Sequence, residues 1–426
     1  LFSIPVLLGN LFQQFYNMVD AIIVGRFVGK QALASVGGSA AVLSNMVIGF
    51  FTGLSAGASV IISQFYGAKD SENVHKSLHT AYASSLIFGV LISVIGFILT
   101  PWLLTIMKTP GDIYQDSVLY LKIYFGGIIF TLIYNMGSSI LRAIGDSRRP
   151  LYFLIVCCFL NIVLDIVFVV FLHMGIAGAA IATVISQAVS AFLVTYSLTA
   201  AYGIMKLKEI KIHFQLFKSE LKIGLPSGLQ SCMYAITNII IQASINSFGT
   251  DTAAAWAAYG KLDAIFWTVS GAFGIAVTTF AGQNYGAKRY DRVIKSTRVC
   301  LGMSLGVCSC LLAFLVAACR PLYHIFTTDE NVINLGVYML RLIAPSCILS
   351  VFVEILSSTL RSIGDVIVPT FIILGGVCFV RIPWVLFVVP ITNKIFMLLL
   401  SYPLAWGMTL ILLVPYYFYR RKKLTM

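Results

Sequence analysis

Residues 138–146 read Ser-Ser-Ile-Leu-Arg-Ala-Ile-Gly-Asp, and 219 residues later positions 357–365 read Ser-Ser-Thr-Leu-Arg-Ser-Ile-Gly-Asp. The same offset relates Gln-Phe-Tyr-Gly-Ala-Lys at 64–69 to Gln-Asn-Tyr-Gly-Ala-Lys at 283–288. Two matches at one spacing indicate that the chain contains two copies of one unit of roughly 215 residues, an arrangement more typical of transporters than of enzymes.

The composition predicts a membrane protein. Of the 426 residues, 59% are hydrophobic and 11% are charged, and the mean hydropathy is +0.93. Too little polar surface remains to coat a soluble globule, and apolar runs of about 20 or more residues recur along the chain. We therefore expect an all-α, multi-pass protein of the cell membrane with twelve transmembrane helices. These spans are expected at about 2–27, 32–64, 76–106, 114–143, 150–172, 176–202, 221–248, 253–283, 296–326, 333–362, 367–391 and 395–419.

The distribution of positive charge predicts the orientation. When the loops are assigned alternately to the two sides, about 20 Lys and Arg fall on one side and about five on the other, which makes the first side cytoplasmic. Both termini are then cytoplasmic, and we expect a short segment to precede Leu1 because the chain does not begin with Met. The net charge of +13 does not predict a nucleic-acid partner, because such a partner requires the basic residues to share a soluble face.

The repeat predicts two lobes. Six spans per copy is an even number, so both copies enter the bilayer in the same orientation and the two six-helix repeats are parallel. We expect an N-terminal lobe at 1–203, a polar cytoplasmic linker at 204–220, and a C-terminal lobe at 221–426 that ends in a basic tail. We expect the protein to act as a monomer.

Four acidic residues lie deep within the predicted spans. They are Asp20, Asp165, Asp263 and Glu354, out of 16 acidic residues in the chain, and an ionisable group at such a depth indicates function. Asp20, Asp165 and Thr183 each lie about seven residues from the outer end of a span, so a rise of 1.5 Å per residue places all three roughly 10 Å below the outer surface.

Two amides share helix faces with the first-lobe carboxylates. Asn161 precedes Asp165 by four residues and Asn17 precedes Asp20 by three. A cluster of carboxylate, amide and hydroxyl oxygens suits a small hard cation, or a proton shared between two carboxylates. The alternative is that these groups only hold helices together. The second repeat favours the functional interpretation, because Ile241 stands near the position that corresponds to Asp20.

The residues also resemble a known family. The first span, with Gln-Gln-Phe-Tyr-Asn-Met-Val-Asp at 13–20, closely resembles the first helix of multidrug and toxic compound extrusion (MATE) transporters. The resemblance extends through the Tyr-Gly-Ala-Lys and Leu-Arg-x-Ile-Gly-Asp turns of both repeats and covers essentially the whole chain. It implies the MATE/MOP-type fold of two six-helix lobes, in which inward-directed Na⁺ or H⁺ drives the export of organic cations.

Carried over by position, the resemblance assigns functional residues. The ion site, with possible Na⁺ ligands, falls on Asp20, Asn161, Asp165 and Thr183, and Pro5 matches the proline at which the first helix is proposed to bend. The seventh span carries no acid, which resembles the DinF-like branch, where the first-lobe aspartate is central. The residues expected to line the substrate cleft are Asp263, Glu354, Tyr234, Asn238, Gln242, Phe266 and Trp267.

We therefore expect a secondary active antiporter that exports small organic cations in exchange for H⁺ or Na⁺. A flippase for lipid-linked oligosaccharides or lipids, from the same superfamily, is the alternative, and a receptor or scaffold is a third reading that the duplicated lobes disfavour. An enzyme is not expected, because no nucleophile elbow or P-loop is present. The nine cysteines follow no metal-binding spacing, and no cofactor is expected.

Overall fold

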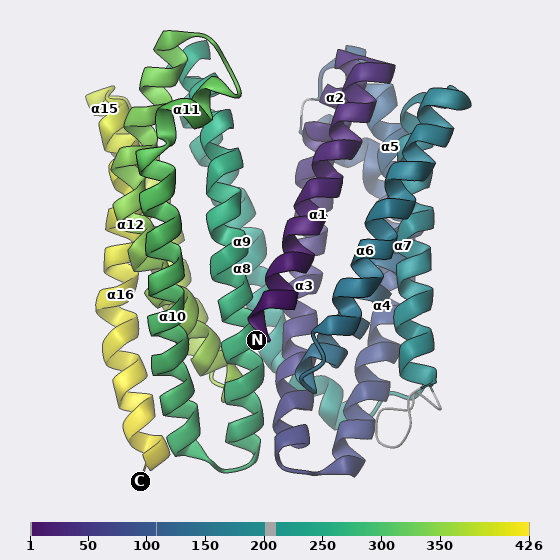
Figure 1. The fold of residues 1–426 in the computed structure, drawn as a ribbon, viewed down its shortest axis with the longest axis vertical. Helices are drawn as coiled ribbons and strands as arrows, with labels where there is room; N and C mark the ends of the chain where they lie inside the picture. Colours follow the sequence, from purple (N-terminus) through teal and green to yellow (C-terminus); the bar gives the residue numbers. More distant parts are fainter. Residues whose placement is uncertain (1, 108, 201–209, 426) are drawn as a thin grey trace. The chain divides into compact units, whose positions relative to one another are not determined.

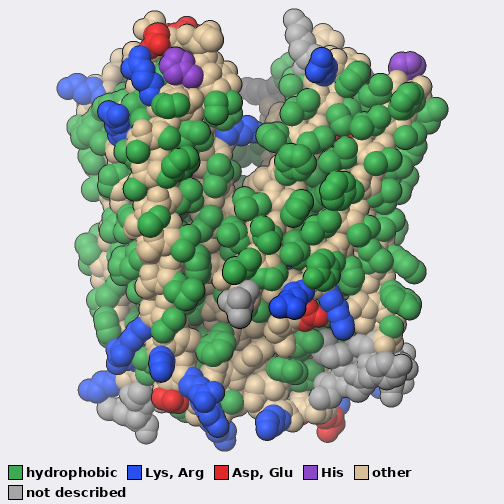
Figure 2. Space-filling view, in the orientation of Figure 1, with side chains coloured by type: hydrophobic (Ala, Val, Ile, Leu, Met, Phe, Trp, Pro, Cys, Tyr) green, Lys and Arg blue, Asp and Glu red, His purple; other side chains and the backbone are tan. Residues whose placement is uncertain are grey.

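The computed structural model describes residues 2–107, 109–200 and 210–425, and within these ranges the chain is helical, with no strand. Among the described residues, ten helices are long and apolar enough to cross a membrane. The protein is therefore a multi-pass membrane protein. Neither Ser3–Ile23 nor Phe214–Asn246, which overlap two of the twelve predicted spans, is among the ten. In Figure 2 hydrophobic side chains cover the middle of each half of the molecule, and most Lys and Arg lie toward the ends.

The chain divides into two compact units, at 1–228 and 229–426. This division lies inside helix α8 (Phe214–Asn246), which begins within the predicted linker. Residues 204–209 of that linker lie outside the described residues. The other helices of the first unit, shown in purple to teal in Figure 1, are α1 (Ser3–Ile23), α2 (Lys30–Gly37), α3 (Ser39–Gly67), α4 (Ser71–Ile106), α5 (Gly111–Ala143), α6 (Arg148–Asp165) and α7 (Gly175–Thr199).

The second unit repeats long helices separated by short turns, and the span before its last helix, at 367–392, is broken into short segments. These helices are α9 (Thr250–Gly286), α10 (Tyr290–Ala317), α11 (Cys319–His324), α12 (Glu330–Ser362), α13 (Ile367–Leu374), α14 (Arg381–Pro383), α15 (Val389–Thr392) and α16 (Ile395–Thr425), with π-helical segments η4 (Gly375–Val380) and η5 (Trp384–Val388).

The repeated sequence motifs form turns of the same geometry. Lys69 and Lys288 both have left-handed backbones, with φ of 59° and 57°, and Gly145 and Gly364 have φ of 96° and 83°. The main-chain hydrogen bonds match as well, because the amide of each of these lysines donates to the carbonyl oxygen three residues earlier. Glycine is needed at the second pair, since positive φ strains other residues.

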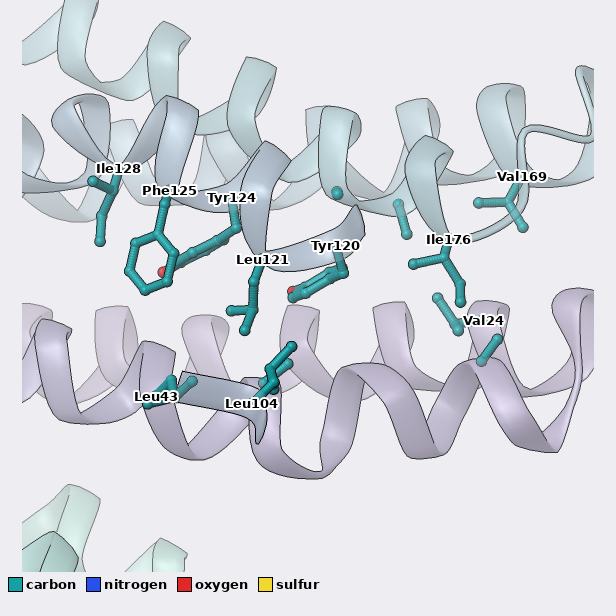
Figure 3. Packing of buried hydrophobic residues seen from close by; sticks show 14 of the residues in the cluster. Val24, Leu43, Leu104, Tyr120, Leu121, Tyr124, Phe125, Ile128, Val169 and Ile176 are labelled. Atoms are coloured by element: carbon teal, nitrogen blue, oxygen red, sulfur yellow. The ribbon is translucent and has the colours of Figure 1, made fainter. Parts of the chain in front are cut away.

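The core of the first unit is built around α5. Tyr120, Leu121 and Phe125 of this helix are buried, and Figure 3 shows their side chains among those of neighbouring helices. Leu104 of α4 and Val24, which follows α1, belong to the same buried cluster. Close packing of these large apolar side chains fixes the helices that carry the polar residues described below.

Candidate cation site

Helix α6 places Asn161 and Asp165 one turn apart on one face, inside the first unit. They are 1% and 0% exposed. Within the part of the chain that the structure describes, both amide atoms of Asn161 and both carboxylate oxygens of Asp165 have no hydrogen-bond partner. A buried carboxylate without a partner costs several kcal/mol in an apolar interior, so this site favours a proton or a cation.

Helix α1 brings a second carboxylate to the first. Helices α1 and α6 pack against each other, as Figure 1 also shows, and the carboxyl groups of Asp20 and Asp165 lie close to each other. The buried Oδ1 of Asp20 has no donor among the described residues. Two ionised carboxylates can only accept hydrogen bonds, so their close approach requires a shared proton or a cation between them.

Helix α7, which packs on α6, contributes a hydroxyl and an amide. Thr183 is 9% exposed and donates to the carbonyl oxygen of Ala179 at 3.1 Å, which leaves its oxygen free to accept or to coordinate. Gln187 follows one turn later on the same face, and its buried Oε1 has no partner in the described ranges. Gln187 was not predicted, although a polar amide four residues after Thr183 in an apolar span is a usable signal.

Tyrosines of α5 complete the surroundings. Tyr120 is buried and lies near both carboxylates, and Tyr124 follows it one turn later with its ring stacked on that of Tyr120. The phenol of Tyr120 can donate a hydrogen bond to a charged carboxylate. Two stacked tyrosines thus lie beside the polar residues of the candidate site, and Tyr120 is near both carboxylates.

Both carboxylate-bearing helices change their winding just beyond the site. The π-helical segment η2 (Ile166–Phe171) begins directly after Asp165, and η1 (Val24–Val28) begins four residues after Asp20. π-Helical turns are rare and occur frequently at functional sites. Helix α1 itself is continuous, and Pro5 lies in its first turn, where proline is tolerated because no helical hydrogen bond is lost. The bend at Pro5 stays a prediction.

The structure does not bring Asn17 into this buried cluster. Asn17 is exposed, whereas Asp20 on the same helix is partly buried. Asp20, Asp165, Asn161 and Thr183 therefore lie on helices that pack together, whereas Asn17, although it is also on α1, has an exposed side chain.

In the second unit, Asp263 has partners. Its carboxylate accepts hydrogen bonds from the Tyr259 hydroxyl at 3.1 Å and from Nε1 of Trp267 at 2.9 Å, both on α9. The guanidinium of Arg381 is near Asp263 and lies 3.3 Å from the centre of the Tyr402 ring. Arg381 is 3% exposed. The second unit therefore contains a carboxylate with hydrogen-bond donors and a buried cation. In the first unit, by contrast, the Asp165 carboxylate has no hydrogen-bond partner among the described residues.

The other predicted cleft residues have different surroundings. Phe266 is buried in the interior of the second unit, and Trp267 is 37% exposed beside Trp406. Glu354 accepts a hydrogen bond from Ser358 at 3.2 Å.

The predicted polar residues of α8 lie on its less buried part. Tyr234 is half-buried, whereas Asn238 and Gln242 are exposed, and Gln242 donates to Asn246 at 2.8 Å. These positions leave the cleft assignment a prediction.

Comparison with known proteins identifies relatives over the whole chain. The MatE family model matches residues 5–167 and again residues 226–387. The chain is 30% identical over 435 residues to the probable multidrug resistance protein YoeA of Bacillus subtilis, covering 99% of this chain and 93% of that protein. It is 22% identical over 368 residues to the multidrug export protein MepA of Staphylococcus haemolyticus, covering 85% and 80% of the two chains.

Solved structures share the fold. A MOP superfamily transporter from Pyrococcus furiosus superposes with a TM-score of 0.93 at 22% identity, covering 100% of this chain and 95% of that one. A MATE transporter in the bent conformation gives a TM-score of 0.92 at 21% identity, covering 99% and 94%.

Proposed function

Because the chain belongs to the MATE family of multidrug efflux transporters, we propose that it exports organic cations in exchange for H⁺ or Na⁺ by alternating access. It is a membrane transporter of small molecules and not an enzyme. The relatives are multidrug resistance and export proteins, so the flippase alternative is not favoured.

The observation that carries the proposal is the pair of carboxylates at Asp20 and Asp165, which are close together and have no cationic partner among the described residues. In our proposal H⁺ or Na⁺ binds between them, with Asn161 and Thr183 as further oxygen donors. The same negative charge attracts an organic cation when the ion is absent. Ion and substrate thus compete for, or are coupled through, one site.

Coupling requires that the ion bind the inward-facing and outward-facing states of the transporter with different affinities. A ligand shifts a conformational equilibrium only by its differential affinity for the two states, and moving a population from 1:99 to 99:1 takes a ratio of about 10⁴. The π-helical turns next to Asp20 and Asp165 provide a place where ion binding can change helix winding. We propose that this change carries the difference in affinity.

We propose twelve spans, with α1 and α8 added to the ten apolar helices. Two separate matches to one family model and the matching turns at Lys69 and Lys288 support two parallel repeats. The excess of Lys and Arg on one side supports cytoplasmic termini in the cell membrane. A single chain contains the whole proposed ion site, which supports a monomer as the working unit.

The test is efflux of a fluorescent organic cation from proteoliposomes, with a pH gradient or a Na⁺ gradient imposed separately. Wild type should export under one gradient, which identifies the ion. Asp20→Asn should lose this coupled export, and Asp112→Asn, which changes an exposed aspartate on α5, should retain it. Normal export by Asp20→Asn would refute the role of Asp20, and no export by folded wild type under either gradient would refute the antiport proposal.

A further inference from the structure

A small cavity lies inside the first unit and shares no lining residue with the cation site. It is lined by α3, α4, α5 and the first turns of α8, and its volume is about 20 Å³. A site for one water molecule needs roughly 10–15 Å³ by this measure, so the cavity admits a guest of about that size. The cavity is lined by Phe51, Leu54, Ser55, Ser84, Ser85, Phe88, Leu132, Met136, Phe217, Glu220 and Leu221.

Glu220 is the one ionisable side chain among these lining residues. It is 5% exposed, and its buried Oε1 has no hydrogen-bond partner in the described part of the chain. Lys218 and Lys222 are its nearest charged neighbours on α8, but both are exposed, and residues two apart on a helix do not face each other. No ion pair involving Glu220 occurs among the described residues.

Ionisable groups close in sequence to the lining residues of α4 and α5 have partners elsewhere. On α4, Tyr82 shares a hydrogen bond with Thr195 at 2.7 Å, and His79 contacts His75 at 3.2 Å. On α5, Tyr134 donates to a main-chain carbonyl of α6 at 3.1 Å. Helix α3 contributes two apolar side chains and a serine. Among the described residues of these three helices, none forms an ion pair with Glu220.

Three serine hydroxyls line the cavity, those of Ser55, Ser84 and Ser85, and two of them donate to main-chain carbonyls. The Ser84 hydroxyl donates to the carbonyl oxygen of Ala81 at 2.8 Å, and the Ser85 hydroxyl donates to that of Tyr82 at 2.7 Å. Their single protons are therefore used, and the oxygens can only accept. A carboxylate is likewise an acceptor, so an ionised Glu220 cannot form a hydrogen bond with the Ser84 and Ser85 oxygens, whereas a carboxylic acid can donate to them.

We propose that Glu220 is a proton-binding site, distinct from the Asp20–Asp165 pair, and that its carboxylic acid donates into the cavity toward the serine oxygens. A proton fits better than an alkali cation, because such a cation needs oxygens on all sides and most of the lining side chains are apolar. A neutral carboxyl also avoids the penalty of several kcal/mol for a buried, unpaired charge. The proton comes from water and no other group is consumed.

The proton links the Glu220 site to the packing of α8 on α3. A Cβ added at Gly57 would lie 2.5 Å from the amide nitrogen of Gly224, and one added at Gly53 would lie 2.5 Å from the Cα of Gly228. The two helix backbones are thus in direct contact along the edge of the cavity. A charged Glu220 needs water, which this contact excludes, so loss of the proton favours separation of α8 from α3.

The first test is unfolding in detergent as a function of pH, for wild type, Glu220→Gln and Glu72→Gln. The glutamine is an uncharged isostere of the acid, and Glu72 is an exposed glutamate of α4. A native state that holds a proton which the unfolded chain releases loses stability as pH rises, by up to about tenfold in the unfolding constant per pH unit. As pH rises, wild type and Glu72→Gln should lose stability to the same extent, and both should lose more stability than Glu220→Gln. A difference between wild type and Glu220→Gln that does not change with pH would overturn the proposal.

A second measurement reads the proton directly. The infrared spectrum of wild type minus Glu220→Gln at neutral pH should contain the carbonyl band of a protonated carboxyl group, and wild type minus Glu72→Gln should not. A carboxylate band in the first difference spectrum would refute the proposal. Stabilisation of wild type, but not of Glu220→Gln, when Na⁺ replaces a large organic cation at constant pH would assign the site to an alkali cation instead and would also overturn it.

Discussion

Replacing Gly53 by alanine should destabilise the first unit, because α3 and α8 touch there through their backbones. The new Cβ would lie 2.5 Å from the Cα of Gly228 and 2.6 Å from the carbonyl carbon of Ser227, whereas ordinary contacts are 3.4–4 Å. Backbone atoms cannot rotate away as a side chain can. The helices would have to separate by roughly 1 Å, and overpacking of this kind costs about 1–3 kcal/mol.

Gly126→Ala on α5 is the matched control, because nothing lies within 4 Å of a Cβ at Gly126. Alanine improves helix propensity by about 1 kcal/mol at either position. With overpacking near the upper end of its range, Gly53→Ala should lose about 2 kcal/mol and Gly126→Ala should gain about 1 kcal/mol. The assay is a denaturant titration in detergent followed by helical circular dichroism. Equal stability of the two variants would refute the backbone contact.

Three further perturbations test separate features. Asn161→Ala should weaken binding of the coupling ion while folding is retained, because the amide has no protein partner among the described residues. The ion affinity can be measured from the thermal stabilisation that the ion causes, and an unchanged affinity would contradict the prediction. Lys69→Gly should stabilise the protein by up to about 1 kcal/mol, because Lys69 has φ of 59° and this conformation strains residues other than glycine. A denaturant titration that shows a lower free energy of unfolding for this variant would count against the prediction. The pKa of Asp70 is lowered chiefly by hydrogen bonds from the side chain and main chain of Asn73. Its contribution to stability is therefore present above the pKa of the unfolded chain and is lost as pH falls through the lower native value, so Asp70→Ala should flatten the acid limb of the unfolding profile.

The burial of Asp165 and Thr183 could be predicted from depth along the helices, whereas their role in ion binding stays a prediction. The rise per residue predicted that Asp165 and Thr183 lie at one level, and the structure buries both on helices that pack together. The i,i+4 spacing also predicted that Asn161 joins Asp165, because residues four apart share a helix face. The i,i+3 spacing was a weaker guide for Asn17, which is exposed.

Other features could not be read from the sequence. The π-helical turns after Asp20 and Asp165 depend on how each helix packs and have no composition of their own. The proximity of Arg381 to Asp263 joins helices far apart in the chain, so it requires the tertiary structure. The Glu220 cavity likewise depends on how α8 packs on α3, where glycines allow the two backbones to approach closely.

The central claim is that the coupling ion binds in the first unit. It is tested most directly by measuring the radioactive Na⁺ bound and the protons taken up by purified wild type, Asp165→Asn and Asp263→Asn. Wild type should bind one of the two ions, Asp165→Asn should lose this binding, and Asp263→Asn should keep it, because Asp263 already has hydrogen-bond donors. Binding that survives in Asp165→Asn and disappears in Asp263→Asn would contradict the account.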